Sequence, residues 1–146
     1  MTMVKQKKIL LVEDNDKDIE LIQLVLTECK LAETVFVIQD GGQVMDYLLC
    51  KGKYINHKNG LPSLIILDVK MPKVDGLEVV QLIKRDAKLK YIPIVIFSTS
   101  AQTREISRCY ELGANAYVVK PVDFNEFYNS IKNIGEFWLK VNTTSY

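Results

Sequence analysis

The feature that most constrains the fold is an apolar run that ends on a single carboxylate. The run 64–67 reads Leu-Ile-Ile-Leu and is followed directly by Asp68. Four large apolar residues in a row suit a strand that is covered on both faces, although periodicity alone does not separate it from a buried helix segment. Two turn signals, Met71-Pro72 and Asp75-Gly76, come next. We therefore expect Asp68 at the carboxyl end of a central strand, where open α/β sheets bind ligands. The plainer alternative is an Asp that only caps the following turn.

The rest of the chain alternates between strand-like and helix-like patterns. Short apolar segments rich in β-formers stand at 8–12, 34–39, 63–68, 92–97 and 115–120. After each of them, apolar residues recur at spacings of three and four, which predicts helices. The last helix has the strongest apolar stripe: Phe124, Phe127, Tyr128, Ile131, Ile134 and Trp138. This alternation predicts an α/β fold with a doubly wound, five-stranded parallel sheet.

Length and composition predict one domain that spans residues 1–146, with a core from about residue 7 to residue 139. A hydrophobic share of 48% and a charged share of 25% are ordinary for a globular protein. The net charge of +1 gives no electrostatic reason to expect nucleic acid. No apolar run approaches the ~20 residues that span a bilayer, and no signal-peptide pattern follows the basic start. We therefore expect neither nucleic acid nor a membrane as a partner.

The cysteines and the single histidine argue against a metal scaffold. Cys29, Cys50 and Cys109 are widely spaced and form no Cys-x-x-Cys pair, which favours a reducing cytoplasm over a disulfide framework or a zinc site. His57 lies in a long polar loop, 51–62, among Lys, Asn and Gly. We expect it to be an exposed loop residue and not a metal ligand or a catalytic base.

Reactive side chains follow four of the five predicted strands. The first strand ends on Glu13-Asp14, the third on Asp68, the fourth on Ser98-Thr99 and the fifth on Lys120-Pro121. Because the carboxyl ends of parallel strands lie at one edge of a sheet, three carboxylates, a hydroxyl and an ammonium group should converge there. Each residue alone has an ordinary explanation as a cap, a turn residue or a solvated charge. Their coincidence at one edge favours a functional site.

In this pattern the chain resembles the receiver domain of bacterial response regulators. The residues that carry the resemblance are Glu13-Asp14, Leu67-Asp68-Val69-Lys70-Met71-Pro72, Asp75-Gly76, Ser98-Thr99, Gly113-Ala114, Tyr117 and Lys120-Pro121. The separations from Asp68 to Ser98 and to Lys120 match the spacing of the family. The resemblance covers Lys8 to about Leu139, and it implies a flavodoxin-like fold with strand order 2-1-3-4-5.

The resemblance also implies a phosphoryl-transfer role for each residue of the edge. Asp68 would be the phosphoacceptor and would receive the group from a phosphohistidine of a sensor histidine kinase. Ser98 would hydrogen-bond the phosphoryl oxygens, and Lys120 would neutralise them. Tyr117 would be the aromatic switch residue, with ordinary packing as its alternative. The domain would then signal through protein interaction and would not be an enzyme, beyond self-phosphorylation from small donors and autodephosphorylation.

A magnesium site is implied at the same edge. Asp14 would bind Mg²⁺ directly, Glu13 through water and Lys70 through its backbone carbonyl. Asp68 would also belong to the metal site. The chemistry of these groups supports the same conclusion, because Mg²⁺ prefers a few carboxylate oxygens together with water and phosphate oxygens. Phosphoryl transfer asks the protein mainly for positioning and charge stabilisation. A carboxylate nucleophile can form a covalent acyl phosphate.

The expected output is a change of one protein face. A phosphoryl group adds negative charge and strong acceptors, so Ser98 should move toward it and Tyr117 should turn inward. This would repack the face formed by the fourth helix, the fifth strand and the fifth helix for an unknown downstream protein or a phosphorelay. The 51–62 loop and the ending Phe137-Trp138-Leu139 also resemble small stand-alone receivers, some of which are paired with bacterial phytochromes. A homodimer through that face or the last helix is an open alternative, as is a purely structural role for the ending.

Two positions depart from the family pattern. Lys70 is a long cation where smaller or polar side chains are frequent, which leads to the hypothesis that autodephosphorylation is altered. Ser98 replaces the commoner Thr, and Thr99 could serve instead only if the strand register shifted by one.

Three rival functions fit the sequence less well. A haloacid-dehalogenase-type hydrolase would need an Asp at position 70, and a nucleotide binder would need a glycine-rich loop after the first strand. A pseudo-receiver scaffold would not need the intact acidic, hydroxyl and lysine set.

Overall fold

The computed structural model describes residues 7–71 and 74–145, so Pro72 of the predicted turn lies outside the described residues. It contains one five-stranded sheet in the order β2-β1-β3-β4-β5, and every neighbouring pair of strands is parallel. The strands and α-helices in chain order are β1 Lys8–Val12, α1 Asp16–Glu28, β2 Thr34–Ile38, α2 Val44–Leu48, β3 Leu64–Leu67, α3 Gly76–Arg85, β4 Ile94–Ser98, α4 Thr103–Glu111, β5 Ala116–Val119 and α5 Phe124–Glu136. The predicted fold class and strand order are confirmed.

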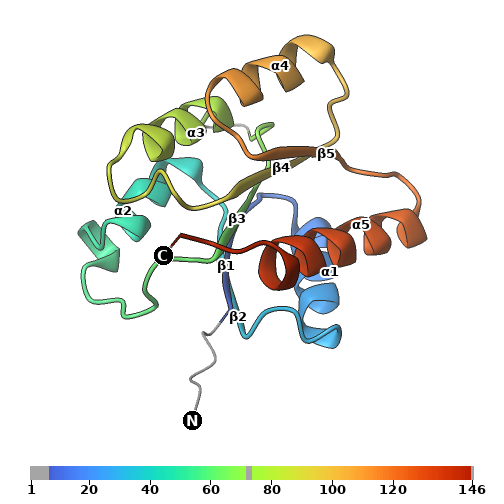
Figure 1. The fold of residues 1–146 in the computed structure, drawn as a ribbon, viewed down its shortest axis with the longest axis horizontal. Helices are drawn as coiled ribbons and strands as arrows, with labels where there is room; N and C mark the ends of the chain where they lie inside the picture. The colour runs from blue at the N-terminus through green and yellow to red at the C-terminus, as the bar shows by residue number, and fades with distance from the viewer. Residues whose placement is uncertain (1–6, 72–73, 146) are drawn as a thin grey trace.

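Helices cover both faces of the sheet (Figure 1). Helices α1 and α5 lie side by side on one face, and α2, α3 and α4 cover the other. Successive strand residues alternate between the two cores: Leu10 faces the α2–α3–α4 side and Leu11 the α1–α5 side. All four residues of β3 are buried, as expected for a central strand with both faces covered.

Side-chain caps start three of the helices just beyond the strand ends. Asn15 accepts from the backbone N–H of Asp18 at the start of α1, Asp75 from that of Leu77 in α3, and Asp123 from that of Glu126 in α5. Each cap satisfies a backbone donor that the first helical turn leaves without a partner. The strand-to-helix turns at this edge are therefore fixed locally.

The loop after β3 folds back on itself at a glycine. A Cβ atom on Gly76 would lie 2.5 Å from the Cα of Val69 and 3.1 Å from the carbonyl oxygen of Asp68. The neighbouring Asp75 forms an antiparallel bridge with Lys70. Only a residue without a side chain permits this approach. The Asp75-Gly76 pair of the sequence motif thus sets the backbone around Asp68.

The prediction that His57 is an exposed loop residue is wrong, because the structure buries part of its ring. His57 stacks on Tyr47 with 4.3 Å between ring centroids, and its Nε2 lies 2.6 Å from the carbonyl oxygen of Tyr47. Phe36 stacks on Tyr47, and Tyr54 packs edge-on against it. Aromatic residues from three separate segments therefore hold the 51–62 loop against the domain.

The end of the chain also differs in detail from the prediction. In the predicted stripe of α5, Phe127, Ile131 and Ile134 are buried, whereas Phe124 in the first turn is 61% exposed. The helix continues beyond Glu136 as a π-helical turn, Phe137–Val141. Within the described residues, no helix has the length and apolar character needed to cross a bilayer.

Candidate functional site

The ends of four strands bring the predicted residues to one edge. The sheet hydrogen bonds continue past the strands into these residues: Glu13 donates its N–H to Ile38 O at 3.1 Å, Asp68 to Val12 O at 3.0 Å, and Lys120 to Ser98 O at 2.7 Å. Because the backbone of each residue is tied to the neighbouring strand, the parallel register fixes their relative positions. The predicted convergence of Glu13, Asp68, Ser98 and Lys120 at this edge is therefore found in the structure.

Lys120 is the centre of the cluster. Its Nζ donates to Glu13 Oε2 at 2.6 Å, to Asp18 Oδ2 at 2.9 Å and to Asp68 Oδ2 at 3.1 Å, and the residue is only 7% exposed. Burial alone would lower the pKa of Lys120, but the hydrogen bonds and charges of these carboxylates outweigh it and raise the pKa above its usual range. Lys120 is therefore a permanent cation.

Asp18 was missed by the sequence analysis. It lies in the first turn of α1, where acidic residues are common because they favour the positive end of the helix dipole. The usable signal is its position three residues after the Asn15 cap, which turns its side chain back over the strand ends.

Three carboxylates gather beside Lys120. One oxygen each from Glu13, Asp14 and Asp68 lies within 4.8 Å of the other two. Burial raises the pKa of Glu13 to about 7; the Lys120 hydrogen bond opposes the rise, and the Asp68 charge adds to it. Closely spaced carboxylates repel each other unless a proton or a cation joins them. Their number, spacing and oxygen chemistry fit one hard divalent cation such as Mg²⁺.

Both carboxylate oxygens of Asp68 have partners. Oδ1 accepts from the backbone N–H of Lys70 at 2.9 Å, and Oδ2 accepts from Lys120 Nζ. Asp68 is 6% exposed. The side chain is thus held in one orientation at the end of β3.

A hollow of about 260 Å³ opens next to Lys120, and Asp18, Leu21, Thr99, Lys120, Pro121, Val122, Phe124 and Phe127 line it. Its rim carries exposed apolar side chains, since Val122 is fully exposed and Phe124 is largely so. Part of the edge beside the cluster therefore presents an apolar surface to solvent.

Ser98 and Tyr117 lie on neighbouring strands behind the cluster. Ser98 is fully buried and pairs with Val119, whereas Thr99 is exposed, so the register supports Ser98 as the inward hydroxyl. The Tyr117 hydroxyl donates to the carbonyl oxygen of Ser100 at 2.8 Å. Burial raises the pKa of Tyr117, and its interactions with Ser98 and Ser100 partly offset that rise. Tyr117 is therefore anchored to the loop that follows β4.

The side chain of Lys70 turns toward α4. Its Nζ lies 3.3 Å from Glu105 Oε1, and its side chain is 51% exposed. The cation that the sequence analysis expected beside the reacting group is thus paired with a helix of the α2–α3–α4 side.

Comparison with known proteins gives consistent matches over almost the whole chain. The family model described as the response regulator receiver domain matches residues 9–132. Response regulator Rcp1 of Synechocystis sp. is 36% identical over 137 residues, which cover 94% of this chain and 92% of Rcp1.

Two solved structures are similar in both fold and sequence. The crystal structure of the phosphorylated cyanobacterial phytochrome response regulator RcpA has a TM-score of 0.91 at 41% identity, with 97% of this chain and 100% of RcpA covered. The Mn²⁺-bound form of Rcp1 has a TM-score of 0.89 at 36% identity, with 96% and 99% covered.

Proposed function

We propose, from the premise that this chain belongs to the response regulator receiver domain family, that it accepts a phosphoryl group on Asp68 from a sensor histidine kinase. The observation that carries the proposal is the arrangement of Asp68 itself. One oxygen is oriented by a backbone N–H and the other by a buried ammonium group, next to two further carboxylates. A nucleophile held this way loses little freedom when it meets its substrate.

The transfer is a displacement at phosphorus. An oxygen of Asp68 attacks the phosphorus of the kinase phosphohistidine, an O–P bond forms, and the P–N bond breaks with its electron pair going to the imidazole nitrogen. Lys120, which already contacts Asp68 Oδ2, stabilises the negative charge of the phosphoryl oxygens. The Ser98 hydroxyl donates to one of those oxygens. The product is an acyl phosphate on Asp68.

Mg²⁺ fits the carboxylate cluster. The carboxylates of Glu13, Asp14 and Asp68 would hold it, with the backbone carbonyl of Lys70 as a further oxygen ligand. When bound, it supplies positive charge that offsets the carboxylates and the phosphoryl oxygens. The Mn²⁺-bound form of Rcp1 supports a divalent ion here, because Rcp1 shares 36% of its sequence with this chain.

The signal leaves through protein contacts. Phosphorylation draws Ser98 toward the new group and lets Tyr117 turn inward, which changes the α4-β5-α5 face for a downstream protein, a phosphorelay partner or a second copy of the chain. The kinase partner is of the phytochrome type and acts in the cytoplasm. The similarity to the phytochrome response regulator RcpA supports this partner. The apolar rim at Val122 and Phe124 gives the kinase a surface beside Asp68.

Intact-mass spectrometry with a small phosphodonor and Mg²⁺ tests the proposal. The wild type should gain one phosphoryl adduct, and Asp68→Asn should gain none. Asp16→Asn is the matched control, because Asp16 is an exposed acid near the same edge and should keep the adduct. Chelation of Mg²⁺ should abolish the adduct in the wild type and in Asp16→Asn. A wild type that gains no adduct from the donor or from a kinase would instead be a pseudo-receiver scaffold.

A further inference from the structure

Lys70 links the phosphoacceptor to helix α4. Its backbone N–H donates to Asp68 Oδ1 at 2.9 Å, while its Nζ lies 3.3 Å from Glu105 Oε1 in the first turn of α4. The Glu105 side chain is 21% exposed, so its carboxylate is partly withdrawn from solvent. One residue therefore contacts both the reacting group and an element of the output face.

Glu105 continues this connection toward Tyr117. Its second oxygen, Oε2, accepts from the hydroxyl of Ser100, and the carbonyl oxygen of Ser100 accepts from the Tyr117 hydroxyl at 2.8 Å. Lys70, Glu105, Ser100 and Tyr117 thus form a continuous polar chain from the loop after β3 to β5. We call these four residues the relay.

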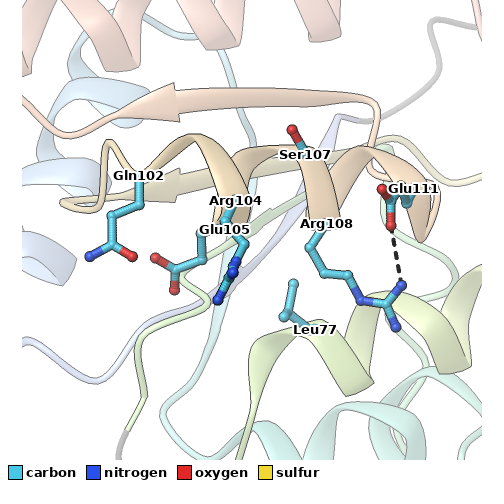
Figure 2. A pocket seen from close by; sticks show the side chains of 7 residues that line it. All are labelled: Leu77, Gln102, Arg104, Glu105, Ser107, Arg108 and Glu111. Atoms are coloured by element: carbon cyan, nitrogen blue, oxygen red, sulfur yellow. Dashed lines mark hydrogen bonds and ion pairs between the residues drawn. The ribbon is translucent and has the colours of Figure 1, made fainter.

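Glu105 also lines a cleft of about 360 Å³ between α3 and α4. Figure 2 shows its side chain beside Gln102, on the side of α4 that faces Leu77 of α3. The ion pair between Arg108 and Glu111 lies at the other end of the same helix (Figure 2). The helix therefore carries two acidic residues in ion pairs, one in the relay and one outside it.

The carboxylates at the carboxyl edge of the sheet outnumber the single buried cation, Lys120, so a second cation could bind there. Glu13, Asp14, Asp18 and Asp68 gather around Lys120, which already donates to three of them. A phosphoryl group adds further negative charge and strong acceptor oxygens. Lys70 has a compact ammonium group on a flexible stem, and its backbone is already in contact with Asp68.

We propose that Lys70 and Glu105 form a latch that opens when Asp68 is phosphorylated; this rests on the function proposed above. Lys70 Nζ leaves Glu105 Oε1 and binds the phosphoryl oxygens. Glu105 then loses its cation but keeps the hydrogen bond from the Ser100 hydroxyl. An exposed ion pair contributes little to stability, so a stronger anion can displace it. Glu105 is thus a positioning residue that keeps Lys70 away from the empty phosphoryl site.

A double-mutant cycle on phosphoryl binding tests the latch. The probe is beryllium trifluoride, which occupies the place of a phosphoryl group on a carboxylate, and calorimetry with Mg²⁺ present gives its dissociation constant. Glu105→Gln keeps an acceptor for Ser100 but removes the charge that holds Lys70, so binding should tighten roughly two- to fivefold, the range measured for exposed ion pairs. Lys70→Met should weaken binding, and adding Glu105→Gln to Lys70→Met should change nothing further.

Glu111→Gln is the matched control, because it removes the same charge from α4 at a residue that pairs with Arg108. Its affinity for the probe should equal that of the wild type. Two results would overturn the latch and leave the proposed function standing. In the first, wild type and Glu105→Gln bind the probe equally well. In the second, Glu105→Gln changes the probe affinity by the same factor in the wild type and in Lys70→Met. No probe binding and no phosphoryl adduct in the wild type would overturn the proposed function, and the latch with it.

Discussion

Lys120 and Lys70 both lie next to Asp68, but the protein holds their ammonium groups in opposite ways. Lys120 is 7% exposed, and three carboxylates accept from its Nζ. The side chain of Lys70 is 51% exposed, and a single carboxylate of α4 pairs with it. A buried cation with several partners cannot move without leaving those partners unpaired, whereas an exposed one can exchange partners through water. Lys120 is therefore a fixed charge that serves the phosphoryl transfer, and Lys70 is a movable charge that serves signalling.

The largest effect should come from removing the fixed charge. Lys120→Met leaves Glu13, Asp18 and Asp68 without their common cation, so the free energy of unfolding should fall by roughly 3 kcal/mol. Urea unfolding at neutral pH in EDTA measures this. A loss below about 1 kcal/mol would mean that Lys120 is no more tightly held than an exposed lysine. The proposed difference between Lys120 and Lys70 would then be wrong.

Removing one negative charge from the carboxylate cluster should have the opposite effect and raise the stability of the protein. Asp14 has an oxygen within 4.8 Å of Glu13 and Asp68 oxygens. Asp14→Asn relieves repulsion, so in EDTA the protein should become more stable by on the order of 1 kcal/mol. Thermal unfolding with and without Mg²⁺ checks it, because the wild type should be stabilised by the ion and the variant much less. Unchanged Mg²⁺ stabilisation in Asp14→Asn would remove Asp14 from the metal site.

The fixed part of the site could be predicted because its residues follow strands directly. Glu13, Asp68, Ser98 and Lys120 each stand at the end of an apolar run, and parallel register then brings them together. Pairings made by helical side chains could not be predicted in this way. Asp18 and Glu105 find their lysines only through the rotation and tilt of α1 and α4, which packing against the sheet decides.

Other parts of the fold needed information that short patterns lack. The strand order came from the family resemblance, since alternating strands and helices are compatible with more than one order. The partial burial of His57 depends on Phe36 and Tyr47, which lie outside its own loop. Contacts across the fold decided this position against the polar composition of its own loop.

A loss of stability of similar size to the gain in Asp14→Asn is expected at Tyr117, the far end of the relay. Tyr117→Phe removes the hydroxyl that donates to the carbonyl oxygen of Ser100, so stability should fall by about 1 kcal/mol, the usual contribution of one hydrogen bond. Urea unfolding measures the change, and hydrogen exchange should rise around Ser100 with little change near Glu13. An equal rise at both places would show that the relay and the buried cluster are one cooperative unit.

The smallest effect is expected for the movable charge itself. Lys70→Met removes an exposed ion pair with Glu105, and such pairs contribute about 0–1 kcal/mol, so the change in unfolding free energy should stay below roughly 0.5 kcal/mol. Urea unfolding under the conditions used for Lys120→Met measures this change. Glu105 keeps its hydrogen bond from Ser100 in this variant, which limits the cost further. A loss close to that of Lys120→Met would mean that Lys70 is as firmly bound to α4 as Lys120 is to its carboxylates, and a phosphoryl group on Asp68 could then not draw it away.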